Sequence, residues 1–220
     1  MDTTSSYIPL RIAVLARLKE AIVNDVLTPG TVLRENAIAA QLSVSRTPVR
    51  EAIRMLEQEK LVTLLPGRKM VVSTPDRQDI AEIYDIRLVL ETEALRRITA
   101  ERTDILTELQ DCVDRSKRAV AENDSEQLRT ANTEFHMLLT SSLNNKRLRD
   151  FLESLYDLIC RFRAYSLEDE GWAEQGVREH EEMVLLLAAG KQDQAIEMLR
   201  EHLEQAREIL VTKFSAGGAS

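Results

Sequence analysis

The chain contains three histidines, His136, His180 and His202, and each lies on the apolar stripe of a segment with helical periodicity. A single histidine on such a stripe is more often a core residue than a ligand. Three of them on three different helices can converge inside a bundle and hold a metal ion with open coordination positions. Asn132 lies one turn before His136, so its side-chain oxygen faces the same way. The imidazoles therefore predict a site for a divalent transition metal, with zinc or nickel expected.

Three arginines are candidates for binding an anionic effector in the same half of the chain. Arg87 lies on an apolar stripe, and a buried arginine needs an anionic partner. That partner is either a carboxylate of the effector or an acid of the chain such as Glu91, and the sequence favours neither. Arg161 and Arg163 are weaker candidates for the same pocket.

A second group of polar residues crowds the start of a predicted helix, where Arg46, Thr47 and Arg50 follow Ser45. A helix N-terminus offers free N–H groups and a positive dipole to phosphate. Arginine can pair bidentately with guanine, and threonine or serine can bond a phosphate or contact a thymine methyl group. A basic turn further along suits the sugar-phosphate backbone. The predicted DNA contacts are Arg34, Asn36, Ser45, Arg46, Thr47, Arg50, Arg54, Gly67, Arg68 and Lys69.

The elements that must position these residues divide the chain near Pro75. Before it, the pattern predicts helices over about 8–26, 36–42 and 45–60, with Ser45 as an N-cap, and strands over 61–65 and 70–73. This order is that of a winged helix-turn-helix. After it, the pattern predicts helices over about 76–100, 103–123, 125–143, 146–166, 174–189 and 192–214, which form an antiparallel bundle. Trp172 falls in a predicted loop, where packing is favoured over a lid.

The fold class is therefore mainly α, with a winged helix-turn-helix domain over 1–75, a helical domain over 76–214, and a disordered tail over 215–220. The net charge of -8 divides into +3 for residues 1–75 and -11 for the remainder, so only the first domain needs to approach phosphates. No apolar run is long enough to span a membrane, and the N-terminus has no secretory pattern. Cys112 and Cys160 form no CxxC pair, which fits the reducing cytoplasm.

The N-terminal half resembles a known family of bacterial regulators. The stretch Ser45-Arg46-Thr47-Pro48-Val49-Arg50-Glu51-Ala52, preceded by Pro29-Gly30 and followed by Leu61-Val62, is similar to the GntR-family DNA-binding domain over about residues 8–75. Asn36 stands where many members carry a phosphate-contacting arginine, and Arg34 can substitute for it. The wing has Gly67-Arg68-Lys69 where members usually have Arg-Gly. The resemblance implies a regulator that binds a double-stranded DNA operator.

The C-terminal half resembles the FCD ligand-binding domain of FadR-type members over about residues 77–212. The resemblance rests on Asn132 and His136 in one helix, on His180-Glu181, and on His202-Leu203. It implies that Asn132 and the three histidines hold the metal and that a small organic acid is the effector. Because Asn132 is neutral, we expect weaker metal affinity than with an acidic ligand, and stronger attraction for an anionic effector.

Together these features predict a ligand-responsive regulator, a repressor rather than an activator, that binds a palindromic operator as a homodimer. Effector binding in the bundle changes its affinity for DNA. One alternative is a metal sensor, in which the ion itself is the effector. The other is a metalloenzyme whose three histidines activate water. It is disfavoured because Glu134 and Glu179 lie off the apolar stripes and no HExxH motif is present, so no catalytic residue is predicted.

Overall fold

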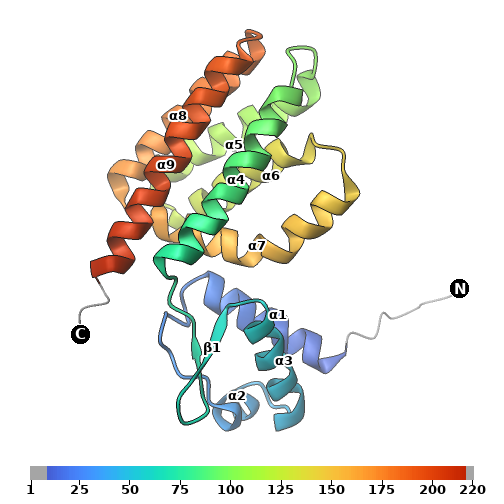
Figure 1. Cartoon of the computed structure of the whole chain (residues 1–220), viewed down its shortest axis with the longest axis vertical. Helices are drawn as coiled ribbons and strands as arrows, with labels where there is room; N and C mark the ends of the chain where they lie inside the picture. Colours follow the sequence, from blue (N-terminus) through green and yellow to red (C-terminus); the bar gives the residue numbers. More distant parts are fainter. Residues whose placement is uncertain (1–8, 217–220) are drawn as a thin grey trace, which may run out of the picture. The chain divides into compact units, whose positions relative to one another are not determined.

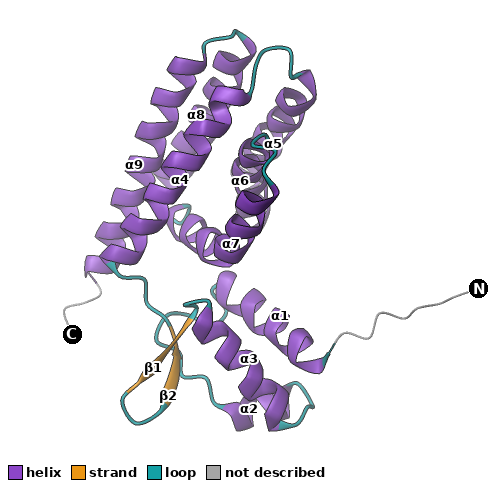
Figure 2. Ribbon diagram, turned by 45° about the vertical axis from the view of Figure 1, so that its right-hand side comes forward, coloured by secondary structure: helices purple, strands orange, loops and turns teal. Residues whose placement is uncertain are grey.

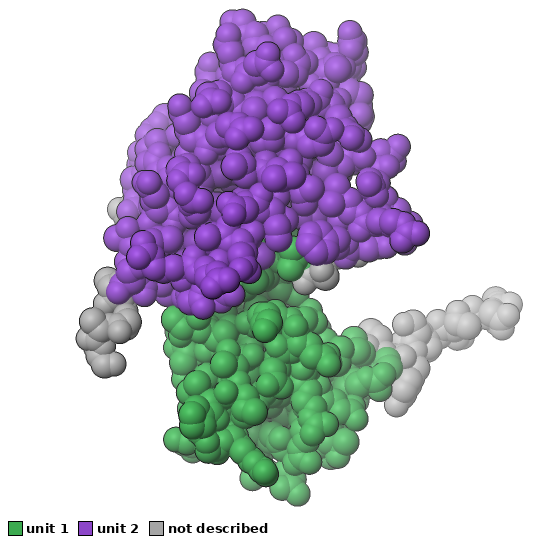
Figure 3. Space-filling model, in the orientation of Figure 1, with its two compact units in different colours: residues 1–74, 154–161 green, residues 75–153, 162–220 purple. Residues whose placement is uncertain are grey.

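The computed structural model describes residues 9–216. The chain divides into two compact units, one formed by residues 1–74 and 154–161, the other by residues 75–153 and 162–220 (Figure 3). Each unit has its own arrangement of elements and is described separately below.

Unit 1 contains three helices followed by a β-hairpin. The helices are α1 (Leu10–Val23), α2 (Glu35–Gln41) and α3 (Arg46–Gln58), and the strands are β1 (Val62–Leu65) and β2 (Lys69–Val72). The strands are antiparallel, with Val62 opposite Val72 and Leu65 opposite Lys69. Gly67 and Arg68 between them both have positive φ, which closes the wing in a tight turn. The predicted winged helix-turn-helix order is confirmed (Figure 1).

The amphipathic pattern of α3 explains which of its faces is exposed. Val49, Ile53 and Leu56 are buried against α1 and the hairpin in one apolar cluster that also contains Ile22 and Val72. The opposite face is left to solvent, and it carries the polar residues of the first turn. Ser45 occupies the predicted N-cap position, but its side chain makes no capping hydrogen bond.

Unit 2 is an all-helical bundle, as predicted (Figure 2). Its helices are α4 (Arg77–Arg97), α5 (Thr103–Glu122), α6 (Ser125–Ser141), α7 (Lys146–Ser166), α8 (Glu170–Ala188) and α9 (Gln192–Ala216), and α7 contributes residues 154–161 to unit 1. Helix α4 packs against α9, α5 packs against α6 and α8, and α8 packs against α9. No helix within residues 9–216 is long and apolar enough to cross a membrane.

Side-chain caps fix the starts of several of these helices. Asp76, Asp124, Asn145 and Asp169 each accept a hydrogen bond from a backbone N–H in the first turn. Such a cap typically stabilises a helix by about 1 kcal/mol.

The Asp169 cap also corrects one expectation from the sequence. It accepts from the N–H of Trp172 at 2.9 Å, so α8 begins at Glu170 and Trp172 lies in its first turn, buried, instead of in a loop. The glycines in this stretch indicated a break, but the cap and the packing of Trp172 outweigh their low helix propensity. At the other end, α9 continues to Ala216, and the rest of the predicted tail, 217–220, lies outside the described residues.

Candidate metal centre and DNA-contacting surface

Helices α6, α8 and α9 bring His136, His180 and His202 together inside unit 2. All three side chains are buried, and one potential ligand nitrogen from each lies within 4.8 Å of the others. The Nε2 atoms of His180 and His202 are 3.3 Å apart. Phe135 stacks on His180 with 4.0 Å between ring centroids, and Trp172 lies 4.8 Å from the His202 ring. Sequence reasoning placed these histidines on inward faces, and the structure brings all three into one cluster.

Two of the histidines are oriented by carboxylates. Glu91 Oε2 lies 2.7 Å from His136 Nδ1, and Glu179 Oε2 lies 2.7 Å from His202 Nδ1. An ionised carboxylate only accepts hydrogen bonds, so each Nδ1 carries the proton. The Nε2 atom of each ring is then left with its lone pair. This is the arrangement that prepares histidine to bind a metal ion.

The cluster is uncharged at neutral pH because of its burial. Burial lowers the pKa of His136 to about 3, even though Glu91 opposes the change. Burial and the neighbouring imidazoles hold the pKa of His180 well below its ordinary value. Burial also lowers the pKa of His202, against the opposing effect of Glu179. Neutral imidazole is the form that coordinates metal ions.

The spacing of the nitrogens fits a transition metal. Zinc–nitrogen bonds of roughly 2.0–2.1 Å in a tetrahedral arrangement place neighbouring nitrogens roughly 3.3 Å apart. The separation between His180 and His202 already equals this value, at 3.3 Å. Any pair nearer the 4.8 Å limit must close to reach it. Asn132 is also buried, one turn before His136 on α6, and its amide makes no hydrogen bond to a residue within 9–216.

Arg87 meets an acid of its own chain. Its Nε donates to Glu91 Oε1 at 2.9 Å, and Arg163 donates to the same oxygen at 3.4 Å. Burial alone would raise the pKa of Glu91, but Arg87, His136 and Arg163 together hold that pKa below its ordinary value. Glu91 is therefore ionised and links both arginines to the cluster. The terminal nitrogens of Arg87 make no hydrogen bond to a carboxylate within the described part of the chain.

Arg161 has a different role from Arg163. It is fully buried in unit 1, where its guanidinium donates to the Ser73 carbonyl at 2.7 Å and to the Ser73 hydroxyl at 3.1 Å. Two residues of α-helix turn the chain by about 200°, so neighbouring arginines at this spacing point to opposite faces. From the sequence, Arg161 is a candidate for the effector pocket, and in the structure its guanidinium binds Ser73, directly after β2.

The ten predicted DNA contacts are all exposed in unit 1. Arg50 differs from the others because Glu35 binds its guanidinium in a bidentate pair, with Nε to Oε1 at 2.9 Å and a terminal nitrogen to Oε2 at 2.8 Å. Arg46, at the start of α3, has no carboxylate partner among the residues that the structure describes. Glu35 was missed from the sequence because it is 15 residues from Arg50 and on another helix. Helix α2 packs on α3 and brings the two together.

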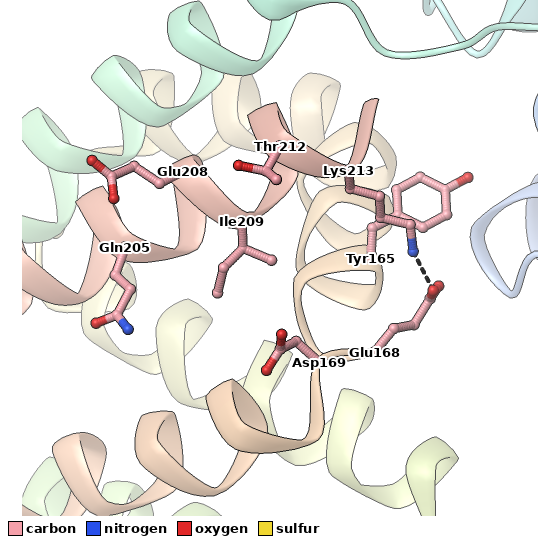
Figure 4. Close-up of a pocket in the computed structure, with 8 residues that line it drawn as sticks. All are labelled: Tyr165, Glu168, Asp169, Gln205, Glu208, Ile209, Thr212 and Lys213. Atoms are coloured by element: carbon pink, nitrogen blue, oxygen red, sulfur yellow. Dashed lines mark hydrogen bonds and ion pairs between the residues drawn. The ribbon is translucent and has the colours of Figure 1, made fainter. Parts of the chain in front are cut away.

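A pocket of about 570 Å³ lies between α9 and the corner joining α7 to α8 (Figure 4). It is lined by Tyr165, Glu168, Asp169, Gln205, Glu208, Ile209, Thr212 and Lys213. Lys213 pairs with Glu168 and lies over the Tyr165 ring. One of the acidic groups that line the pocket is therefore already neutralised by a lysine of the pocket. No sequence pattern pointed to this pocket.

The geometry of the two units defines a class of protein. A winged helix-turn-helix with an exposed basic recognition helix, joined to a helical bundle, is the architecture of a DNA-binding regulator. The chain belongs to the GntR family of bacterial transcription regulators and carries an FCD domain. The model described as "Bacterial regulatory proteins, gntR family" matches residues 10–72, and the FCD domain model matches residues 82–205.

Individual relatives agree with this assignment. The chain is 31% identical over 160 residues to the gluconate operon transcriptional repressor of Bacillus licheniformis, covering 69% of this chain and 65% of that one. It is 32% identical over 167 residues to the HTH-type regulator YdhC of Bacillus subtilis (strain 168), covering 74% of each. A solved GntR regulator from Rhodococcus sp. RHA1 superposes with a TM-score of 0.81 at 27% identity, covering 92% of this chain and 97% of that one. All three are named as transcription regulators, in agreement with the family to which this chain belongs.

Proposed function

We propose that this protein is a cytoplasmic repressor that binds a palindromic operator as a homodimer. Residues 1–75 read the DNA, and residues 76–214 dimerise and bind the effector. Asn132, His136, His180 and His202 hold one divalent transition ion, zinc or nickel. A small organic acid completes the coordination of that ion and changes the affinity of the dimer for its operator.

The observation that carries the proposal is the buried cluster of three neutral imidazoles, two of them oriented by carboxylates. A metal ion would bind the Nε2 lone pairs of His136 and His202, and His180 would add a third imidazole ligand once its nitrogen released its proton. The FCD domain that the chain carries implies the same four ligands, Asn132 and the three histidines, which agrees with this assignment. The residues present therefore fit the ion that the family implies.

Two further observations support an organic acid as the effector. Asn132 adds no negative charge, so an ion held by four neutral ligands keeps its full positive charge and attracts a carboxylate. Arg87 retains terminal nitrogens that can bind the effector's other end in a bidentate pair. A relative that represses a gluconate operon is consistent with this class, because gluconate is itself a carboxylate.

The second candidate is a metal sensor, which the same cluster also favours. The two functions differ in what changes DNA binding. DNA selected from a random library for binding to this protein supplies the probe, and its affinity is measured by fluorescence anisotropy with added organic acids and, separately, with a chelator. A response to an acid only in the metal-loaded protein supports the proposal. A response to the chelator alone, with no acid active, supports the metal sensor.

The dimer is tested separately by light scattering. A single winged helix offers a small contact, whereas a dimer reads two half-sites about 34–36 Å apart or a multiple of this. A monomer at micromolar concentration, with and without DNA, would contradict this part of the proposal.

A further inference from the structure

Several side chains of α8 contact the imidazole of His202. Trp172 lies against the ring, at 4.8 Å between centroids, and a methyl group built on Gly176 would lie 3.5 Å from its Cε1 atom. Glu179 accepts from Nδ1 at 2.7 Å, and His180 meets Nε2 at 3.3 Å. Three residues of one helix, Trp172, Glu179 and His180, thus contact a single ring of α9.

Among these contacts, the hydrogen bond that Glu179 accepts determines which nitrogen of His202 carries the proton. With Nδ1–H donated to Glu179, the Nε2 atom of His202 has only a lone pair. The 3.3 Å contact with His180 is then a hydrogen bond in which His180 Nε2 donates and His202 Nε2 accepts. Without the carboxylate, His202 could carry its proton on Nε2, and that nitrogen could no longer bind a metal ion.

Glu179 differs from Glu91, which has the same contact with His136. Glu91 is fully buried and shared by Arg87, Arg163 and His136, so removing it would leave buried charges without partners. Glu179 lies near the surface, and its second oxygen accepts from Gln175 at 2.8 Å. Gln175 is in turn bonded to Gln205 at 3.0 Å, so amides from α8 and α9 hold the carboxylate in place.

We propose that Glu179 is a positioning residue of the metal centre, which holds the proton of His202 on Nδ1 and so keeps Nε2 available as a ligand. This inference rests on the proposed metal site and adds a residue that sequence reasoning had set aside. Its effect would be transmitted through His202, because Glu179 is hydrogen-bonded to Nδ1 and not to the nitrogen that would bind the ion.

The test compares Glu179→Ala with Glu181→Ala, both in the full chain. Glu181 lies two residues along the same helix and pairs with Lys117 at the surface, so it is a matched control for loss of a carboxylate from α8. Zinc affinity is measured by competition with a chromophoric chelator. We expect Glu179→Ala to bind zinc about 10- to 100-fold more weakly, the loss typical of such outer contacts. Glu181→Ala should bind as wild type does, and Glu179→Gln, which keeps one acceptor oxygen, should fall between them.

A second measurement does not depend on metal. Nitrogen–proton NMR correlations of the metal-free protein report which nitrogen of His202 is protonated, and we expect Nδ1 in wild type and a mixture in Glu179→Ala. Equal zinc affinity in folded wild type and Glu179→Ala overturns this inference alone, as does an unchanged proton position. Wild-type protein that binds neither zinc nor nickel overturns the proposed metal site together with it.

Discussion

The recognition surface of unit 1 and the histidine cluster of unit 2 are both polar, but they are built in opposite ways. The predicted DNA contacts are exposed, and most have no ion pair recorded in the described residues. The cluster is buried, and each of its charged neighbours has a defined partner. A surface that binds a long polyanion can leave its side chains mobile until the partner arrives. A site for one small ion must be arranged beforehand, because a misplaced buried ligand has no water to replace it.

The largest expected effect is a change in unit 2 that leaves DNA binding by unit 1 unaffected. His180→Ala removes one of three imidazoles and should abolish stable zinc or nickel binding and the response to an organic acid. Affinity for DNA without effector should stay unchanged, because the winged helix forms its own core. Elemental analysis and anisotropy measure the two properties. If wild type and His180→Ala both take up no metal after incubation with zinc and nickel, the histidines are core residues only.

The next effect is within the recognition surface. Arg46→Ala should weaken operator binding by roughly 1–3 kcal/mol and relax sequence preference, as expected for loss of a bidentate contact with a base. Arg50→Ala should have a smaller effect, because Glu35 already occupies one edge of that guanidinium. Affinities for selected and scrambled duplexes measure both. An Arg46→Ala protein that binds its operator as wild type does would show that the recognition helix has been misplaced.

Acid should destabilise unit 2 through the cluster. Because burial lowers the pKa of His136 to about 3, its contribution to stability is complete above the unfolded-state value of about 6.5 and is lost progressively as pH falls toward 3. Below about pH 6.5, each histidine that stays neutral in the folded state lowers the free energy of unfolding by about 1.4 kcal/mol per pH unit, because it binds a proton only in the unfolded state. The melting temperature of metal-free protein should therefore fall between about pH 6.5 and about pH 5, before ordinary carboxylates titrate. A constant melting temperature over this range would mean that the rings accept protons in the folded state.

The smallest effect is at the wing. Lys69→Ala should weaken binding to all duplexes about equally and reduce the slope of log affinity against log salt by about one, as expected for a single phosphate contact. A salt titration with selected and scrambled DNA measures it. A loss confined to the selected duplex would instead mean that Lys69 reads bases.

Periodicity in the sequence was sufficient to predict the fold and to place each histidine on the inward face of its helix. It also offered Glu91 as one of two partners for Arg87, because residues four apart on a helix are neighbours. It could not predict contacts between helices. His136 and Glu91 are separated by 45 residues and His202 and Glu179 by 23, so only the packing of the bundle reveals which acid meets which ring. For the same reason Arg161 was grouped with Arg163, although the two point to opposite faces of α7.

Gly176 has a consequence for movement as well as for packing. It lies inside α8, where alanine would favour the helix by about 1 kcal/mol. A methyl group there would be in van der Waals contact with the His202 ring, at 3.5 Å from Cε1. With glycine at this position, that contact with the ring is absent. A cluster whose nitrogens span up to 4.8 Å needs freedom of movement in at least one ring to contract around an ion.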